Sequence, residues 1–174
     1  NELPNDSPLP TMPRRLVVFT RYPEPGTTKT RLIPALGSEG AARLQHDLTR
    51  RVLARARELR ELAGIEIEVR FEGGDAEKMT ATFGRDLPYV AQGPGDLGCR
   101  MERAFGESFA DGVGKAVLIG ADCPDVTAEL LRNAFQQLAD HDLVLGPAAD
   151  GGYYLAGLRS SEPSLFEGIV WGSD

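Results

Sequence analysis

The sequence has only two cysteines and two histidines among its 174 residues. Cys99 and Cys123 form no Cys-x-x-Cys motif and no Cys/His cluster, which excludes a disulfide scaffold and a structural zinc site. Long apolar runs are also missing, because the run from Ala116 to Ile119 is far too short to cross a bilayer. These absences predict a protein of a reducing, cytoplasmic setting that does not associate with membranes.

Basic residues are in the minority, at 19 against 26 acidic residues, and the net charge is −7. An acidic chain is a poor partner for nucleic acid or for a membrane surface, so we expect neither. The length suits one domain with a sizeable core. Residues 1–13 contain four prolines and no apolar segment, and we expect them to form a disordered arm before a single domain over residues 14–174. The oligomeric state stays open.

Apolar periodicity predicts strands and helices that alternate along the chain. The expected strands cover 15–20, 65–71, 87–91, 115–119 and 142–145, and an aromatic strand follows Gly152. The expected helices cover 38–62, 75–83, 96–109 and 127–138. This order predicts an α/β three-layer sandwich with a mostly parallel central sheet and right-handed crossovers. Two details are expected with it: a half-buried strand at 65–71 near a sheet edge, and a solvated basic face on the first helix (Arg43, Arg50, Arg57).

Ligands of such sheets bind beyond the carboxyl ends of the strands. Four loops of unusual composition lie at those ends, after Thr20, Ala91, Ile119 and Leu145. Their convergence on one edge of the sheet is a stronger indication of a binding site than any single loop.

The first of these loops, from Phe19 to Leu32, is cationic and rich in hydroxyl groups. Pro23, Pro25 and Gly26 exclude a helix or strand there. Arg21, Lys29 and Arg31 supply charge, and Thr27, Thr28 and Thr30 supply hydroxyls. Charge, hydroxyl donors and free amides are what a bound polyphosphate requires, so the loop predicts phosphate binding. The alternative is a solvated surface loop.

A P-loop is a further alternative for this segment, because Lys29-Thr30 matches the end of its motif. Thr28 and Pro23 stand where that motif requires glycines. The proline would also remove an amide donor from the phosphate nest, so the P-loop interpretation is disfavoured.

Two acids, Asp122 and Asp150, leave the ends of neighbouring candidate strands opposite the basic loop. They predict an Mg²⁺ or Mn²⁺ site that phosphate oxygens would complete. Instead of binding metal, Asp122 could cap the helix at Thr127 or accept amides in its own turn. Instead of binding nucleotide, Asp96 could be a helix N-cap. A nucleophilic role for Cys123 is disfavoured, because Pro124 follows it and no histidine is near in the sequence.

Four segments in the same order resemble a bacterial transferase family associated with radical-SAM and selenium-linked genes. These segments are Phe19 to Leu32, Gly95 to Met101, Ile119 to Pro124 and Gly146 to Tyr154. The family is nucleotide-diphospho-sugar transferase-like, with a glycosyltransferase-A fold, and is similar to phospholactate guanylyltransferases. The resemblance implies that Arg21, Lys29 and Arg31 grip nucleotide phosphates and that Asp122 binds metal.

One departure from the glycosyltransferase pattern concerns its Asp-x-Asp motif, for which Asp122-Cys123-Pro124 offers a single acid. The resemblance also implies that family members continue past the motif at Trp171. We therefore expect this sequence to lack a C-terminal extension that they have. The favoured function is transfer of a sugar from a nucleotide-sugar to an unknown small-molecule acceptor. The alternatives are nucleotidyl transfer from an NTP to a phosphorylated acid, and nucleotide binding without turnover.

The residues expected to form the site fall into three groups. The catalytic candidates are Lys29, Asp122 and Asp150, and the metal candidates are Asp122 and Asp150. The candidates for nucleotide or phosphate binding are Thr20, Arg21, Gly26, Lys29, Thr30, Arg31, Gly95, Asp96, Arg100, Gly151 and Gly152.

Overall fold

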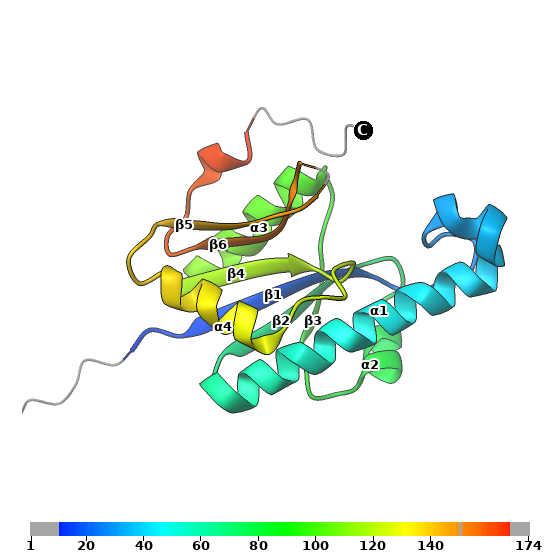
Figure 1. Ribbon diagram of the computed structural model, residues 1–174, viewed down its shortest axis with the longest axis horizontal. Coiled ribbons are helices and arrows are strands. Elements are labelled where there is room, and N and C mark those ends of the chain that lie inside the picture. Colours follow the sequence, from blue (N-terminus) through cyan, green and yellow to red (C-terminus); the bar gives the residue numbers. More distant parts are fainter. Residues whose placement is uncertain (1–10, 150, 168–174) are drawn as a thin grey trace, which may run out of the picture.

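Six strands form one sheet in the computed structural model, which describes residues 11–149 and 151–167 (Figure 1). The strands are β1 (Arg14–Arg21), β2 (Glu66–Glu72), β3 (Tyr89–Ala91), β4 (Lys115–Gly120), β5 (Leu143–Pro147) and β6 (Tyr153–Leu158). The helices are α1 (Ile33–Ala63), α2 (Ala76–Phe83), α3 (Leu97–Ala110) and α4 (Ala128–Gln137), with short 3₁₀ turns η1 (Thr30–Leu32) and η2 (Pro163–Leu165). Residues 1–10 of the predicted arm and the motif at Trp171 lie outside the described residues.

The strand order is β3-β2-β1-β4-β6-β5. Strands β1 to β4 pair in parallel, and β6 runs antiparallel between β4 and β5. The predicted α/β sandwich with a mostly parallel sheet is therefore confirmed. The expectation that the strand before Asp150 neighbours β4 is wrong, because β6 lies between them. A connection as short as residues 148–152 can join only antiparallel neighbours, so β6 folds straight back onto β5.

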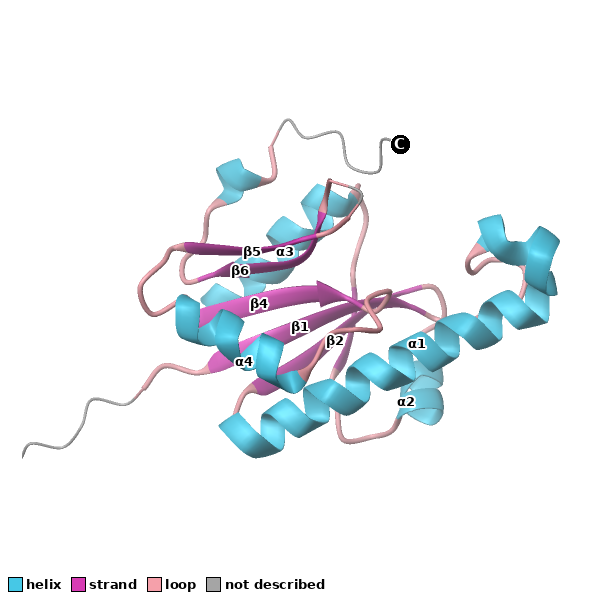
Figure 2. Cartoon of the chain, viewed as in Figure 1, coloured by secondary structure: helices cyan, strands magenta, loops and turns pink. Residues whose placement is uncertain are grey.

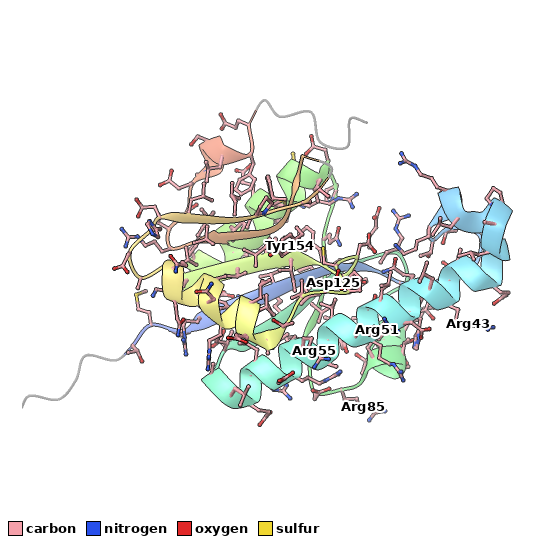
Figure 3. The ribbon with its side chains drawn as sticks, in the orientation of Figure 1. Arg43, Arg51, Arg55, Arg85, Asp125 and Tyr154 are labelled. Carbon is pink, nitrogen blue, oxygen red and sulfur yellow. The ribbon has the colours of Figure 1, made fainter. Side chains whose placement is uncertain are left out.

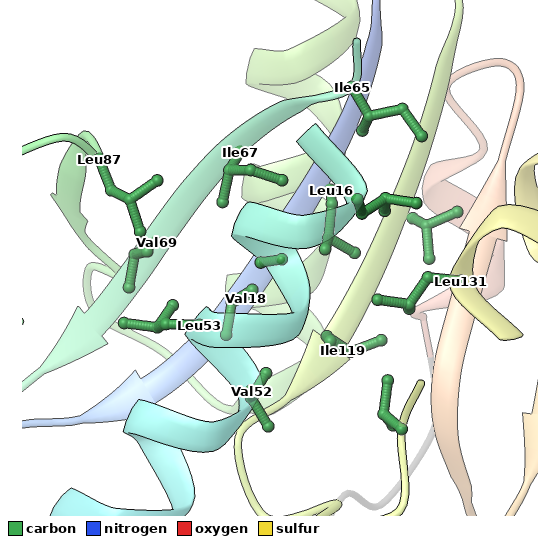
Figure 4. Close-up of a cluster of buried hydrophobic side chains, with 14 of the residues drawn as sticks. Leu16, Val18, Val52, Leu53, Ile65, Ile67, Val69, Leu87, Ile119 and Leu131 are labelled. Atoms are coloured by element: carbon green, nitrogen blue, oxygen red, sulfur yellow. The ribbon is translucent and has the colours of Figure 1, made fainter. Parts of the chain in front are cut away.

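Helices cover both faces of the sheet (Figure 2). Alternate residues of β1 point to opposite sides, so Leu16 and Val18 pack under α1, α2 and α4, whereas Val17 and Phe19 pack under α3. Figure 4 shows the first cluster, where Val52 and Leu53 of α1 meet the sheet. Because these side chains are almost fully buried, truncating one to alanine would cost about 2–5 kcal/mol.

Helix α1 contains a break at Gly37, where φ is 73° and ψ is 166°. The regular helix therefore begins at Ser38, as the sequence predicts. The preceding turn, together with η1, extends past the end of the sheet (Figure 1). At the other end Gly64 adopts a left-handed conformation and closes the helix through its amide, which donates to Arg60 O.

The polar face of β2 is buried, so the prediction of a half-buried strand is wrong. Arg70 is only 2% exposed, and its guanidinium contacts Glu68 Oε1 at 2.5 Å and Glu107 Oε2 at 2.6 Å. Glu107 comes from α3, which covers this side of the sheet. A carboxylate on the covering helix allows a charged residue to be buried where alternation alone predicts exposure.

The basic face of α1 is also not wholly solvated. Arg57 binds both carboxylate oxygens of Asp86, at 2.9 and 2.8 Å, and donates to Phe83 O at 2.6 Å. Arg60 adds a contact of 3.2 Å to the same carboxylate. These bonds tie α1 to the segment between α2 and β3. Within the described residues, no helix is long and apolar enough to cross a membrane.

Candidate functional site

The loop after β1 is held by the buried side chain of Thr28. Its hydroxyl donates to Tyr22 O at 2.9 Å and accepts from the Glu24 amide at 3.1 Å. Gly26 has a φ of 87°, which a glycine adopts without strain. These features fold the loop into a compact turn that ends at Lys29.

Lys29 has a left-handed backbone, with φ 48° and ψ 46°. Among the described residues it is the one non-glycine residue with positive φ. A left-handed conformation costs a lysine about 1–2 kcal/mol and is typical of functional sites. The side chain crosses to the loop after β4, where Nζ lies 2.7 Å from Asp122 Oδ1. Two neighbouring parallel strands, β1 and β4, therefore present a joined cation and anion at their carboxyl ends.

Asp122 reaches outward, with 70% of its side chain exposed, whereas Lys29 is 17% exposed. Helix α4 has its own cap, because the Thr127 side chain accepts from the Leu130 amide at 3.1 Å. The alternative role of Asp122 as the cap of this helix is thereby excluded. An exposed carboxylate that reaches a neighbouring loop is available to a ligand.

A second charged group lies at the carboxyl ends of β1 and β2. The Glu72 carboxylate contacts Arg21 Nη2 at 2.6 Å and Arg100 Nη1 at 3.2 Å. The hydrogen bond from Arg21 is the main cause that lowers the pKa of Glu72, with a further contribution from Arg100. The glutamate therefore stays ionised and holds two of the predicted phosphate-binding arginines together. The sequence analysis missed Glu72, although it ends a strand at the edge where the loops converge.

Gln92 is a further residue that the sequence analysis missed. Its buried Nε2 donates to Thr20 O at 2.9 Å and Arg70 O at 3.1 Å, and its Oε1 accepts from Arg100 Nη1 at 3.2 Å. It therefore links the ends of β1 and β2 and orients Arg100. The sequence did contain a signal for this residue, because Gln92 is a polar residue between a strand and a Gly-Pro loop.

The hydroxyl of Thr20 is turned away from the loop edge, and binding of nucleotide by Thr20 remains a prediction. Its Oγ1 lies 2.7 Å from Thr49 Oγ1 and 3.2 Å from Gln45 Nε2, and all three side chains are buried. Alternation along β1 turns this side chain toward α1. Thr20 and Thr49 instead help to hold α1 on the sheet. Thr30 and Arg31 follow Lys29 in η1, and both are exposed.

The loop before α3 caps the amino end of that helix. Asp96 is the N-cap and accepts from the Cys99 amide at 2.9 Å. This amide bond lowers the pKa of Asp96, and the carboxylate in turn raises the pKa of Cys99. Gly95 has a φ of 101°, and its carbonyl accepts from Arg100 Nε at 2.9 Å. Binding of a nucleotide by Gly95 and Asp96 remains a prediction.

The loop between β5 and β6 contains Asp150, which lies outside the described residues. Around it, the Ala148 amide donates to Gly152 O at 2.9 Å and the Gly151 amide donates to Ala148 O at 3.2 Å. Gly151 has a φ of 89°, so a larger residue would be strained there. A cavity of about 380 Å³ separates this loop from the loop after β4.

A metal site built wholly from protein ligands is not present in the described part of the chain. There, no three His, Cys, Asp or Glu residues gather closely enough to hold an ion. The metal role predicted for Asp122 and Asp150 therefore remains a prediction.

Comparison with solved structures identifies the fold. A protein of Desulfovibrio desulfuricans G20, provisionally described as a nucleotide-diphospho-sugar transferase, is 38% identical, with a TM-score of 0.81 over 92% of this chain and 70% of that one. A 4-diphosphocytidyl-2C-methyl-D-erythritol synthase of Anaerococcus prevotii DSM 20548 is 10% identical, with a TM-score of 0.56 over 92% of this chain and 78% of that one. The predicted nucleotide-diphospho-sugar transferase-like fold is therefore confirmed.

Rv0371c of Mycobacterium tuberculosis H37Rv, in complex with manganese, shares the fold at 16% identity, with a TM-score of 0.55 over 90% of this chain and 76% of that one. No curated protein sequence matches the chain. A family model does match, over residues 45–173, which include Asp122 and the loops that follow β3, β4 and β5. The chain belongs to the DUF2064 family, described as an uncharacterized protein conserved in bacteria.

Proposed function

We propose that the protein binds the phosphates of a nucleotide-sugar between the loops after β1 and β4 and transfers the sugar to a small-molecule acceptor. One observation carries this proposal. A strained lysine, Lys29, meets the exposed carboxylate of Asp122 at 2.7 Å, at the edge of the sheet where α/β proteins bind ligands. Strain of this kind clusters at functional sites.

Phosphate oxygens would compete with carboxylates for the cations of the site. Lys29 is paired with Asp122, and Arg21 and Arg100 are paired with Glu72. The two linked phosphates of a nucleotide-sugar together carry two negative charges and accept more hydrogen bonds than one carboxylate, so they can replace these partners. Thr30 and Arg31 are exposed beside Lys29 and would extend the contacts.

Sugar transfer is favoured by the similarity to the D. desulfuricans protein, which is 38% identical. In this reaction an acceptor oxygen bonds to the anomeric carbon, the bond from that carbon to the nucleoside diphosphate breaks, and the acceptor proton passes to solvent. The alternative is nucleotidyl transfer, in which the acceptor oxygen bonds to the α-phosphorus of an NTP and pyrophosphate leaves. The relation to phospholactate guanylyltransferases remains a prediction.

Mg²⁺ or Mn²⁺ is the proposed cofactor. Asp122 would supply one carboxylate ligand, Asp150 a second, and the nucleotide phosphates the remainder, as is usual for Mg²⁺. Such an ion neutralises charge on the leaving phosphate group. Rv0371c with manganese is a precedent for a divalent metal on this fold.

A thermal-shift screen tests the proposal directly, with nucleotides and nucleotide-sugars added in the presence and absence of Mg²⁺ or Mn²⁺. We expect a metal-dependent rise in melting temperature that the Lys29→Ala variant loses. Arg85→Ala is the matched control, because this exposed arginine precedes the amino end of β3, whereas the candidate site lies at the carboxyl ends of the strands. Figure 3 labels Arg85 well apart from Asp125. A shift that survives in Lys29→Ala would contradict the proposed site.

Product analysis then separates the three candidate functions. Release of a nucleoside diphosphate from a sugar donor indicates sugar transfer, and release of pyrophosphate from an NTP indicates nucleotidyl transfer. Tight binding without either product indicates a nucleotide-binding protein without turnover.

A further inference from the structure

The cavity of about 380 Å³ beside Asp122 has a defined shape and composition. The side chains of Val126, Leu130 and Pro147, together with the ring of Tyr154, give it apolar walls. Gly146 makes room for that ring, because a Cβ atom at Gly146 would lie 2.7 Å from Tyr154 Cζ. The cavity is therefore built by the hairpin of β5 and β6 on one side and by the segment after β4 on the other.

Its charged groups are all acidic. Asp122 and Asp125 line the cavity, and no lysine, arginine or histidine is among the described residues that do so. Lys29, which reaches Asp122 from the neighbouring loop, is already paired with that carboxylate. Figure 3 shows Asp125 in the segment after β4, with Tyr154 on β6. In the protein without bound metal, an anionic molecule in this cavity would face two carboxylates and no cation in the described lining.

We propose that this cavity binds the acceptor, and that the acceptor is a neutral or cationic small molecule with a compact apolar body and a hydroxyl or amine. The inference rests on the proposed function, because it takes the Lys29–Asp122 contact as the place where the donor phosphates bind. The apolar walls suit a hydrocarbon or aromatic body, and Asp125, the carboxylate that the proposed metal site does not use, suits a hydroxyl or ammonium head. The donor sugar is a poorer fit, because its hydroxyl groups need polar partners on all sides.

This assignment also separates the two transfer reactions. A phosphorylated acid, the acceptor expected for nucleotidyl transfer, carries several negative charges. Sites for such molecules present arginine or lysine, which the described lining of this cavity does not contain. The cavity therefore favours an alcohol or amine acceptor over a phosphorylated acid.

Three probes with the same ring test the charge preference: benzylamine, benzyl alcohol and benzoate. Their binding to the full chain would be measured by isothermal titration or ligand-observed NMR. We expect benzylamine to bind most tightly and benzoate about tenfold or more weakly than benzylamine, since each like charge in a partly buried site is unfavourable. Benzoate that bound as tightly as benzylamine would overturn the inference.

Two variants locate the binding. Asp125→Lys should abolish the preference for benzylamine over benzoate, whereas Asp140→Lys, at an exposed acid outside the cavity, should leave the preference unchanged. Ala149→Trp places a large side chain at an exposed position of the lining and should abolish binding of all three probes. An unchanged order in Asp125→Lys would overturn the inference.

A last measurement distinguishes acceptor from donor. Benzylamine should bind alongside the nucleotide that gives the largest thermal shift, and mutual exclusion would overturn the assignment to an acceptor. Nucleotide binding by the wild-type protein is measured separately. Its absence, with the probe order intact, would contradict the proposed function and the acceptor role that rests on it, whereas a preference for benzoate would contradict the inference alone.

Discussion

Two ion pairs join distant parts of the chain, one before the amino end of β3 and one after the carboxyl end of β4, and they are built differently. Asp86, before β3, accepts from Nε and Nη2 of Arg57 and is also contacted by Arg60. Arg57 donates in addition to Phe83 O. Asp122, after β4, is held by a single ammonium at 2.7 Å from a lysine with a strained backbone. The pair at Asp86 is therefore made by several contacts, whereas the pair at Asp122 is a single contact from a residue with a strained backbone.

The difference separates a structural role from a ligand-binding role. A bidentate arginine pair fixes its partner in one geometry, whereas a lysine is a point charge that can exchange one partner for another. We therefore expect the Arg57–Asp86 pair to contribute to stability and the Lys29–Asp122 pair to contribute to ligand binding. The four predictions below test that division.

The largest expected effect is on nucleotide affinity. Lys29→Ala removes the ammonium and should weaken nucleotide binding by about 1.5–3 kcal/mol, the range of a hydrogen bond to a charged group. The free energy of unfolding should change by less than about 1 kcal/mol, because the Asp122 carboxylate of the pair is 70% exposed. Calorimetric titration and urea unfolding measure the two quantities, with Arg85→Ala as the control. A large loss of stability without a loss of affinity would reverse the division.

Arg57→Ala should show the opposite pattern. Loss of the bidentate contact and of the bond to Phe83 O should lower the free energy of unfolding by about 1–2 kcal/mol. Nucleotide affinity should stay at the wild-type value, because Asp86 precedes β3 and so lies at the far edge of the sheet. Urea unfolding checks the first expectation and titration the second. A variant as stable as the wild type would show that the redundant contacts carry no stability.

The pH dependence of stability should follow Asp86. The hydrogen bond from Arg57 lowers the pKa of this carboxyl from its ordinary 3.8 to about 2. A lowered pKa in the folded state stabilises the fold above the ordinary value, and this stabilisation is lost as the pH falls from about 4 to about 2. Because Asp86 is partly exposed, the loss should be about 1 kcal/mol.

Urea unfolding between pH 2 and pH 5 measures this loss, which Arg57→Ala should reduce and Lys29→Ala should retain. If Arg57→Ala kept the full wild-type slope over this range, the slope would come from other carboxyl groups.

The smallest expected effect concerns Glu72, which holds Arg21 and Arg100. Glu72→Gln removes the charge that competes with phosphate for these arginines. Nucleotide binding should therefore tighten by about 0.5–1.5 kcal/mol. Titration measures the change, and Glu102→Gln on the exposed face of α3 is the matched control. Weaker binding would show instead that Glu72 is needed to position the arginines.

Much of the fold could be predicted from the sequence, because apolar periodicity sets the faces of long elements. The start of the regular helix at Ser38 and the end of α1 at Gly64 were both predicted within a residue or two, whereas the helical turn before Gly37 was not predicted. The position of β6 was not predicted. Strand order depends on which strand a hairpin pairs with, and apolar periodicity does not determine this pairing. Burial of Arg70 was missed for a similar reason, since its partner Glu107 is supplied by a distant helix.

The candidate site was predictable where a residue type is unusual for its position. Lys29 and Asp122 stand out as charges in loops that follow strands, and the structure brings them into contact. The hydroxyl of Thr20 turns toward α1 and bonds to Thr49, a partner from a distant helix that the sequence does not reveal. Glu72 and Gln92 were missed because their importance lies in partners from other strands and helices, which a single sequence does not reveal.

The most direct test of the central claim is the effect of Asp122→Asn on the thermal shift that nucleotide produces with and without Mg²⁺. Asparagine keeps the shape of the side chain and removes its charge. Without ligand, the variant should match the stability of the wild type within about 0.5 kcal/mol, as is usual for an exposed position. With nucleotide, it should lose the part of the shift that depends on Mg²⁺. A Mg²⁺ response equal to that of the wild type would contradict the assignment of Asp122 to the nucleotide site.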